Sequence, residues 1–130
     1  MANPSILWTG CTPGSGNCSV LVPEALHWAV MPIPAPTVSI VIPAYNEEVS
    51  IRACVVAAIG QTVPAAEIIV VDNRSTDSTG DIVRALQAEY PEVPLIYFQQ
   101  NDEQGLVPTR NFGLDRAQGT VIGRIDADSV

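Results

Sequence analysis

The segment Thr120-Val-Ile-Gly-Arg-Ile-Asp126-Ala-Asp128 is a short, β-branched run that ends in two carboxylates one residue apart. Such a run is typical of a buried strand that delivers an acidic pair to its carboxyl end. An acidic pair in a strand-to-loop turn can hold a divalent cation, and hard oxygen ligands favour Mg²⁺ or Mn²⁺. Acids in loops are common and most are only solvated. The pair therefore gains weight only if other strands deliver matching groups to the same edge.

The composition is that of a globular protein with an acidic surface. The chain has 130 residues, 47% of them hydrophobic and 15% charged, which is enough for one small domain with a core. Six arginines, no lysine and 14 acidic residues give a net charge of −8. This balance argues against nucleic-acid binding and suits a site that recruits cations. The cysteines Cys11, Cys18 and Cys54 lack metal-ligand spacing, so we expect a buried, apolar Cys54 and a reducing, cytoplasmic location.

Residues 1 to 36 differ from the rest of the chain. They are rich in Pro and Gly, and the stretch from Met1 to Pro23 carries no charge. The segment has neither the basic start nor the uninterrupted apolar core of a secretory signal, and its prolines oppose a membrane helix. We expect a poorly ordered leader over residues 1–36, a folded domain over residues 37–130 and no membrane span. A peripheral position at the inner face of the membrane is left open.

From Val38 onward, strands and helices alternate. Apolar runs at residues 38–42, 68–71, 95–98 and 120–125 predict four strands, the first of them ended by Pro43. We expect three helices in the intervening segments, the third of them from about residue 108 to residue 117.

The expected helices carry recognisable end signals. Asn46 is a suitable N-cap for the first helix, with Glu47 and Glu48 in its first turn and Gly60 as its C′ stop. Residues 75–78 offer caps for the second helix. Its expected inner face carries Ile82, Ala85, Leu86 and Tyr90.

The alternation predicts an α/β fold with a Rossmann-like, mostly parallel sheet. Nearly continuous apolar strands indicate that helices cover both faces, and right-handed crossovers place all strand carboxyl ends at one edge. We expect the fourth strand to lie beside the first. Ligands of such sheets bind at this edge, where the strand order reverses. The side chains expected there are Tyr45, Asn46, Asp72, Asn73, Asp126 and Asp128.

The turn after the first strand restricts the kind of ligand. It reads Pro-Ala-Tyr-Asn-Glu-Glu over residues 43–48 and lacks Gly-x-Gly-x-x-Gly, so a dinucleotide cradle is disfavoured. A metal at the acidic pair can neutralise phosphates instead. Asp72 can bond to a base or a ribose, Tyr45 can offer a ring face, and Arg110 can pair with a diphosphate.

Four segments resemble, in the same order, the motifs of family 2 glycosyltransferases with the GT-A fold. Val38-Ser-Ile-Val-Ile-Pro-Ala-Tyr-Asn-Glu-Glu48 looks like the family's opening, and Glu67-Ile-Ile-Val-Val-Asp72-Asn-Arg-Ser75-Thr-Asp77 resembles its second-strand signature. Gly105-Leu-Val-Pro-Thr-Arg110-Asn111-Phe-Gly113 resembles the loop and helix before the acidic pair, and Ile125-Asp-Ala-Asp128 resembles the family's Asp-x-Asp. The resemblance covers residues 38 to 128.

The resemblance implies a nucleotide-diphospho-sugar donor, usually UDP-linked, and transfer with inversion to a hydroxyl of an unidentified saccharide or lipid-linked acceptor. It implies Mn²⁺ or Mg²⁺ held by Asp126 and Asp128. The residues that it implies for the nucleotide-sugar are Pro43, Tyr45, Glu47, Asp72, Arg110 and Asp126.

The family's general base comes from the half that follows Asp-x-Asp. We therefore expect the base beyond Val130 and assign no catalytic residue within the chain. The expectation is a nucleotide-sugar-binding, N-terminal half that is truncated after the fourth strand and inactive alone. Asn73, Arg74 and Arg124 depart from the family pattern, which usually has acidic residues or Gly at the first two positions and an apolar residue at the third.

Simpler structural roles compete with these assignments. Asp72 can cap the following turn, Glu47 can serve the helix dipole, and Arg110 can form a surface ion pair with Asp115 or Glu103. Two other functions also stay open. One is a non-catalytic nucleotide-binding module or the remnant of a disrupted glycosyltransferase gene. The other is a sugar nucleotidyltransferase, although no Gly-rich basic loop follows the first strand.

Overall fold

The computed structural model describes residues 34 to 128. Most of the predicted leader, together with Cys11 and Cys18, lies outside this part of the chain. No helix within residues 34 to 128 combines the length and hydropathy needed to cross a membrane. The strands are β1 (Val38–Ala44), β2 (Glu67–Asp72), β3 (Leu95–Gln99) and β4 (Val121–Arg124), and the helices are α1 (Ile51–Ile59), α2 (Thr79–Glu89) and α3 (Leu106–Leu114).

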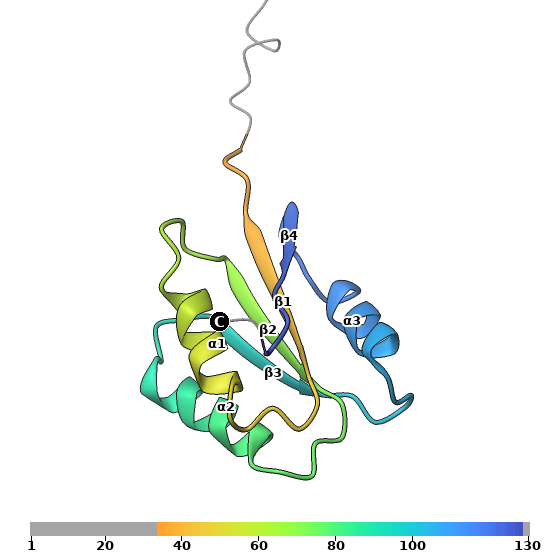
Figure 1. Ribbon diagram of the computed structural model, residues 1–130. Helices are drawn as coiled ribbons and strands as arrows, with labels where there is room; N and C mark the ends of the chain where they lie inside the picture. Colours follow the sequence, from red (N-terminus) through yellow and green to blue (C-terminus); the bar gives the residue numbers. More distant parts are fainter. Residues whose placement is uncertain (1–33, 129–130) are drawn as a thin grey trace, which may run out of the picture. The chain divides into compact units, whose positions relative to one another are not determined.

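The four strands form one parallel sheet in the order β3-β2-β1-β4. In the centre of the sheet, Ile40 of β1 lies opposite Ile68 of β2, and Ile68 lies opposite Leu95 of β3. The order confirms the predicted parallel α/β fold and the predicted position of the fourth strand beside the first. The strand carboxyl ends consequently meet at one edge of the sheet (Figure 1).

Helices cover both faces of the sheet. On one face, β1 and β2 bury Ile40, Ile42, Ile68 and Val70 in a core cluster with α1 and α2. On the other face, α3 packs on β1 and β2. A Cβ added at Gly113 of α3 would lie only 2.5 Å from Val41 Cγ1, so the helix approaches the strands closely. Figure 1 shows α1 and α2 on one side of the sheet and α3 on the other.

Strand β1 does not end at Pro43, as the sequence led us to expect, but continues to Ala44. In a parallel sheet, alternate residues direct their backbone groups to opposite neighbours. The carbonyl of Val41 accepts from Ile125 on the β4 side, and that of Ala44 accepts from Asn73 on the β2 side. The missing N–H of Pro43 therefore faces the β4 side, where the pairing has already ended at Val41 and Arg124.

The expected start of the first helix was wrong. Helix α1 begins at Ile51 with Ser50 as its N-cap, and its first turn holds no acidic residue. Asn46 instead has a positive φ of 51°. Its side-chain Oδ1 accepts a hydrogen bond from the Thr76 amide at 2.8 Å, and its own amide donates to Ser75 Oγ at 2.9 Å.

The turn between β1 and α1 is fastened along its length to the segment before α2. The Glu47 amide donates to Thr79 Oγ1 at 2.9 Å, and the Glu48 amide donates to Asp77 Oδ2 at 3.1 Å. In return, Glu48 Oε2 accepts from the Ser78 amide at 3.1 Å. The first two motifs of the sequence thus hold each other, and this pairing displaced the acids from the helix end that local capping rules assigned to them.

Three smaller expectations about the helices also need correction. Gly60 follows the last residue of α1, but its φ of −79° is not left-handed. On α2, Ala85 is exposed and Val83 is fully buried, because the inward face follows Thr79, Val83 and Leu86. Helix α3 begins two residues before Pro108, since a proline in the first turn removes no hydrogen bond that the helix would make.

Candidate functional site

A pocket of about 450 Å³ lies at the carboxyl ends of β1, β2 and β4. Its walls come from the end of β1 and its turn, the residue after β2, the start of α3 and the turn after β4. The lining residues are Pro43, Ala44, Tyr45, Glu47, Asn73, Gln104, Gly105, Leu106, Thr109, Asp126, Ala127 and Asp128. Four of the strand-edge residues that the sequence singled out are therefore brought together here: Tyr45, Asn73, Asp126 and Asp128.

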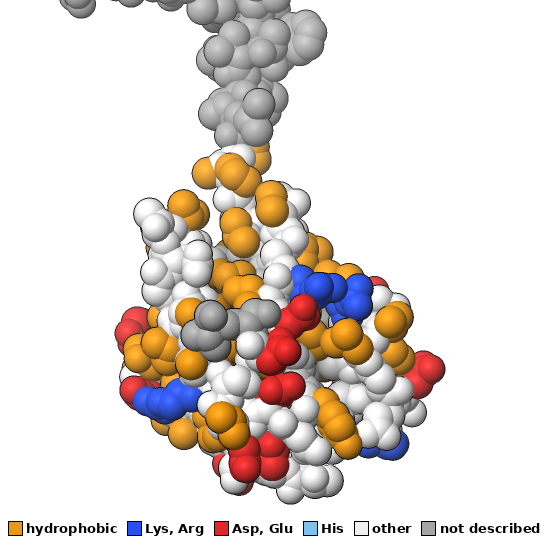
Figure 2. All heavy atoms as spheres, in the orientation of Figure 1, with side chains coloured by type: hydrophobic (Ala, Val, Ile, Leu, Met, Phe, Trp, Pro, Cys, Tyr) orange, Lys and Arg blue, Asp and Glu red, His pale blue; other side chains and the backbone are white. Residues whose placement is uncertain are grey.

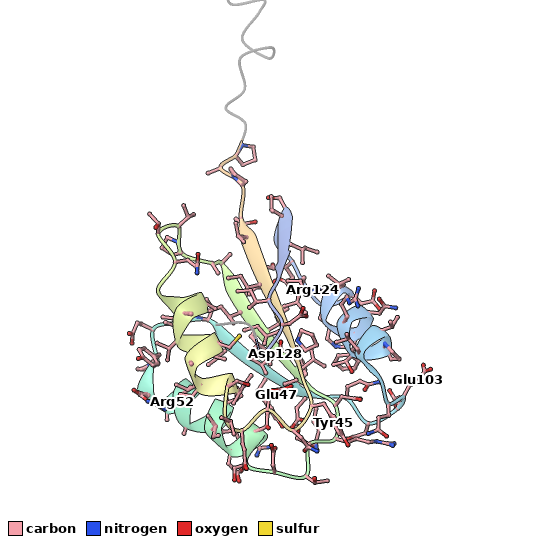
Figure 3. The ribbon with its side chains drawn as sticks, in the orientation of Figure 1. Tyr45, Glu47, Arg52, Glu103, Arg124 and Asp128 are labelled. Atoms are coloured by element: carbon pink, nitrogen blue, oxygen red, sulfur yellow. The ribbon has the colours of Figure 1, made fainter. Side chains whose placement is uncertain are left out.

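Acidic side chains gather at this edge of the molecule. Figure 3 shows Tyr45, Glu47 and Asp128 near one another, with Arg124 above them and with Arg52 and Glu103 farther out on either side. In the space-filling view, acidic side chains follow one another across the same region, and a basic group adjoins them (Figure 2). The lining of the pocket is therefore negatively charged, through Glu47, Asp126 and Asp128, and it attracts a cation better than a bare phosphate.

The two carboxylates of the acidic pair differ in their surroundings. Asp126 Oδ2 accepts from Arg124 Nη2 at 3.2 Å, whereas Asp126 Oδ1 is buried without a hydrogen-bond partner. Asp128 is exposed and lines the pocket. A buried carboxylate oxygen without a donor is costly unless something binds it. The turn after β4 therefore contains one buried oxygen without a hydrogen-bond partner, Asp126 Oδ1, and one exposed carboxylate, that of Asp128.

These residues fit a small divalent ion that shares its coordination with a ligand. Among residues 34 to 128, no three His, Cys, Asp or Glu side chains form a cluster that could enclose a metal by themselves. Mg²⁺ and Mn²⁺ do not require such a cage, because they bind to one or two carboxylates and complete their shell with substrate phosphates and water. Asp126 and Asp128 are the two carboxylates of the turn that could serve in this way, and this role stays a prediction.

Cys54 of α1 lies directly beneath the acidic turn. Its side chain is fully buried, as the sequence predicted, and its Sγ donates to the Asp126 carbonyl at 3.6 Å. Burial raises the pKa of the Cys54 thiol, and the nearby charges of Asp126, Asp128 and Glu47 raise it further. The thiol therefore stays protonated and supports the backbone of the turn.

Asp72 lies at the same edge but does not line the pocket. It is only 2% exposed. Its Oδ1 accepts from the Ser75 amide at 2.9 Å, and its Oδ2 accepts from the Tyr97 hydroxyl at 2.6 Å. Burial, reinforced by this hydrogen bond, raises the pKa of Tyr97, so the phenol keeps its proton. The simpler role of Asp72 as a cap of the following turn is thus present, and its contact with a nucleoside stays a prediction.

Arg110 lies on α3 and is half-buried, outside the residues that line the pocket. Its Nε is buried without a hydrogen-bond partner. The surface ion pair that the sequence offered as an alternative does not form, since the ion pairs within residues 34 to 128 join Arg52 to Glu89, Arg84 to Asp81 and Arg124 to Asp126. A role of Arg110 toward a donor stays a prediction.

The remaining predicted contacts lie on the β1 side of the pocket. Pro43 is buried, Tyr45 exposes 48% of its surface, and Glu47 is half-buried. Glu47 Oε2 accepts from Ser50 Oγ at 2.9 Å, which ties this carboxylate to the residue that caps α1. Tyr45 is therefore accessible to a ligand, while one carboxylate oxygen of Glu47 is engaged within its own turn.

The wall formed by the start of α3 was missed as a site by sequence reasoning. Gly105 has a φ of 139°, a conformation that favours glycine, and Thr109 Oγ1 donates back to the Gly105 carbonyl at 2.5 Å. The sequence signal for this wall was the spacing of Gly105 and Thr109 at the start of the third motif. This spacing does not reveal that the loop of residues 100–105 is bonded to the end of β2.

Comparisons with known proteins give a consistent result. Residues 39–130 match the family described as Glycosyl transferase family 2. The chain is 35% identical over 95 residues to Glycosyltransferase AglE of Haloferax volcanii and 37% identical over 93 residues to Chondroitin synthase of Escherichia coli. Each match covers 72% of this chain, but only 31% and 13%, respectively, of the relative. The chain thus spans less than a third of the length of both relatives.

Solved structures share the fold. Mannosyltransferase PcManGT from Pyrobaculum calidifontis, in complex with GDP-Man and Mn²⁺, aligns with a TM-score of 0.66 and 29% identity. That alignment covers 80% of this chain and 33% of the other. S. aureus TarS 1-349 in complex with UDP-GlcNAc aligns with a TM-score of 0.60 and 28% identity, covering 71% of this chain and 26% of the other. These matches confirm the GT-A fold that the sequence predicts.

Proposed function

Because the chain belongs to glycosyl transferase family 2, we propose that it binds the nucleotide-diphospho-sugar donor of a sugar transfer. We expect a UDP-linked donor, and an acceptor hydroxyl on a saccharide or lipid-linked molecule. Transfer with inversion is part of the proposal. The observation that carries it is the pocket at the strand carboxyl ends, which is lined by Asp126, Asp128 and Glu47.

The arrangement of the pocket supports a donor rather than an isolated phosphate. An exposed ring face at Tyr45 suits a nucleobase or a sugar, and the half-buried Glu47 can accept a hydrogen bond from a hydroxyl or a base N–H. Asp126 and Asp128 would hold Mg²⁺ or Mn²⁺. A bound ion of this kind would supply Lewis-acid stabilisation of the departing diphosphate.

The residues around the acidic pair restrict how a donor can lie. Cys54 and the buried Ala127 support the backbone of the turn that carries Asp126 and Asp128. On this proposal we expect the diphosphate beside the turn and the sugar toward the open side of the pocket. Orientation of this kind lowers the entropic cost of the transfer.

Calorimetric titration of the chain with UDP, in MnCl₂ and again in EDTA, tests the proposal. We expect binding with Mn²⁺ and a loss of most of the affinity after chelation. Asp128→Ala should weaken Mn²⁺-dependent binding by about tenfold or more, since it removes one of two proposed ligands. Asp115→Ala is a matched control, because Asp115 is exposed and does not line the pocket. Equal UDP affinity in EDTA, or equal affinity of Asp128→Ala, contradicts the metal role. A parallel titration with GDP tests the nucleotide, and tighter binding of GDP than of UDP contradicts a UDP-linked donor.

A further inference from the structure

Asn73 is a buried side chain that connects three separate points of one loop. It follows β2 directly and is only 2% exposed. Its Nδ2 donates to the Glu103 carbonyl at 2.9 Å and to the Gln100 carbonyl at 3.3 Å, and it also contacts the Gln100 side-chain oxygen. Its Oδ1 accepts from the Gly105 amide at 2.9 Å. One amide group therefore spans the loop of residues 100–105 from its start to its end.

The same loop is held at two further points next to Asn73. The Gln100 amide donates to the Asp72 carbonyl at 2.8 Å. Arg74 has a left-handed φ of 60°, and its guanidinium donates to the Asn101 carbonyl. Residues 72 to 74 thus hold the loop from one side, with the buried amide of Asn73 in the middle.

The loop matters because it leads straight into the wall of the pocket. Gly105 is the N-cap of α3, and Gln104, Leu106 and Thr109 line the pocket beside it. The Gly105 amide that is bound to Asn73 belongs to the N-cap of this helix. The side chain at the end of β2 is thus bonded directly to the residue at which this wall begins.

The contacts that this chain makes at position 73 use both the donor and the acceptor of an amide. The two loop carbonyls need N–H donors, while the Gly105 amide needs an acceptor, and an asparagine side chain supplies both. An aspartate of the same size would accept from Gly105 but would set a negative charge against both carbonyls. Both N–H groups of Nδ2 and one acceptor site of Oδ1 are engaged within the protein, so Asn73 borders the pocket with its donors already used.

We propose that Asn73 is a positioning residue that sets the distance between the α3 wall and the acidic turn, and thereby the fit of the donor. The effect on donor fit rests on the proposed function. The effect of Asn73 on the position of the loop and of α3 does not. Asn73 touches neither reacting atoms nor metal in this assignment. It acts through Gly105 and the start of α3.

The experiment compares Asn73→Asp with Gln87→Glu in the full chain. Gln87 makes the same kind of bond far from the pocket, since its Nε2 donates to the Leu95 carbonyl at 2.9 Å. Each change replaces an amide by a carboxylate of equal size. Two quantities are measured: hydrogen exchange of the amides of residues 100–106 relative to those of β2, and the affinity for UDP in MnCl₂.

We expect Asn73→Asp to accelerate exchange in residues 100–106 by about tenfold or more and to weaken UDP binding on the order of tenfold, as the loss of buried hydrogen bonds implies. Gln87→Glu should leave both at the wild-type value. If Asn73→Asp fails to fold by circular dichroism, Asn73→Ala replaces it, with the same direction expected.

The inference is overturned if Asn73→Asp exchanges the amides of residues 100–106 at the wild-type rate. It is also overturned if Asn73→Asp accelerates this exchange but binds UDP with wild-type affinity. Equal effects of Gln87→Glu also overturn it, because they show a general loss of stability. Failure of the wild-type chain to bind UDP would contradict the proposed function instead. The exchange comparison would then still decide whether Asn73 holds the loop.

Discussion

Arg124 is paired with one of the two carboxylates that we assign to a metal. The ion pair with Asp126 measures 3.2 Å, and the two side chains are 42% and 40% exposed, respectively. The residue departs from the apolar pattern expected for this strand. At the exposed edge strand β4 its charge is tolerated, because the head group remains in water. The positive charge of Arg124 lies beside the proposed metal site, so it should repel a bound cation.

Replacing Arg124 by methionine should therefore tighten Mn²⁺ binding by the nucleotide-free protein. Unit charges about 5 Å apart interact by about 3 kcal/mol at an effective dielectric constant near 20, and exposure and salt reduce this considerably. We expect an affinity gain of roughly threefold to tenfold, measured by titration of free Mn²⁺ by electron paramagnetic resonance.

Arg52→Met is the matched control for this change. Arg52 forms a surface ion pair of the same kind with Glu89, at 2.8 Å, and does not line the pocket. Its replacement should leave Mn²⁺ affinity unchanged. Weaker or equal binding by Arg124→Met would mean that the arginine does not oppose the metal.

At the scale of elements, Asp77 both caps the start of α2 and binds the turn that follows β1. Asp77 Oδ1 accepts from the Thr79 amide at 3.0 Å, while Oδ2 accepts from the Glu48 amide at 3.1 Å. Desolvation acts to raise the pKa of the Asp77 carboxyl, but the hydrogen bonds from Thr79 and from the Glu48 amide outweigh it, so the pKa is lowered. The charged form is therefore preferred in the folded state.

This preference predicts a pH-dependent cost for Asp77→Asn. A carboxyl whose pKa is lowered by folding contributes stability above its unfolded pKa of about 3.9, and the contribution disappears as pH falls through the folded pKa. Asp77→Asn should lower the free energy of unfolding by about 1 kcal/mol at pH 7, as the loss of a capping group does. The difference from wild type should shrink below about pH 4. Urea unfolding at several pH values measures it.

Asp81→Asn serves as the comparison for this series. Asp81 lies in the first turn of the same helix and pairs with Arg84 at 3.2 Å on the surface. Its replacement should have little effect at any pH, as is usual for exposed pairs. A cost of Asp77→Asn that stayed constant from pH 7 to pH 3 would contradict the charge-based account.

The elements were predictable where the signal is local, and less so where partners lie far apart in sequence. Four apolar runs defined the strands, and their pattern indicated a parallel sheet. The start of α1 was not predictable in this way, because Asn46, Glu47 and Glu48 bind to a segment about 30 residues away. Local capping rules assign such side chains to the nearest helix, whereas the fold uses them to join two turns.

The candidate site follows the same division. The acidic pair and Tyr45 were predictable, since strand ends of a parallel sheet converge whatever the side-chain details. The α3 wall was not, because its position depends on Asn73, which the sequence shows only as a departure from a motif. Buried polar contacts of this kind have no periodicity, so they become visible only when the loop that they bind is in place.

At the scale of the whole molecule, core and pocket belong to one stretch of chain. Within residues 34 to 128, the buried core residues run from Ile40 to Ala127, and the pocket residues run from Pro43 to Asp128. Just before β1, the carbonyl of Thr37 accepts from the Val121 amide at 3.0 Å, and the Thr37 amide donates to Thr120 Oγ1 at 3.0 Å. These bonds pair the start of β1 with β4, the strand that carries the acidic turn.

Two truncations a few residues apart should consequently behave differently. A chain that begins at Ala35 keeps Thr37, and its free energy of unfolding should stay within about 0.5 kcal/mol of the full chain, with unchanged Mn²⁺-dependent UDP affinity. A chain that begins at Ser39 loses Thr37 and Val38, and with them the hydrogen bonds that pair the start of β1 with β4. It should be less stable by about 1 to 3 kcal/mol and bind UDP more weakly, because the acidic turn follows β4 directly. Urea unfolding and calorimetry compare the three chains. A loss of stability or affinity already at Ala35 would assign a structural part to the leader and contradict the prediction that the domain from residue 37 onward folds without it.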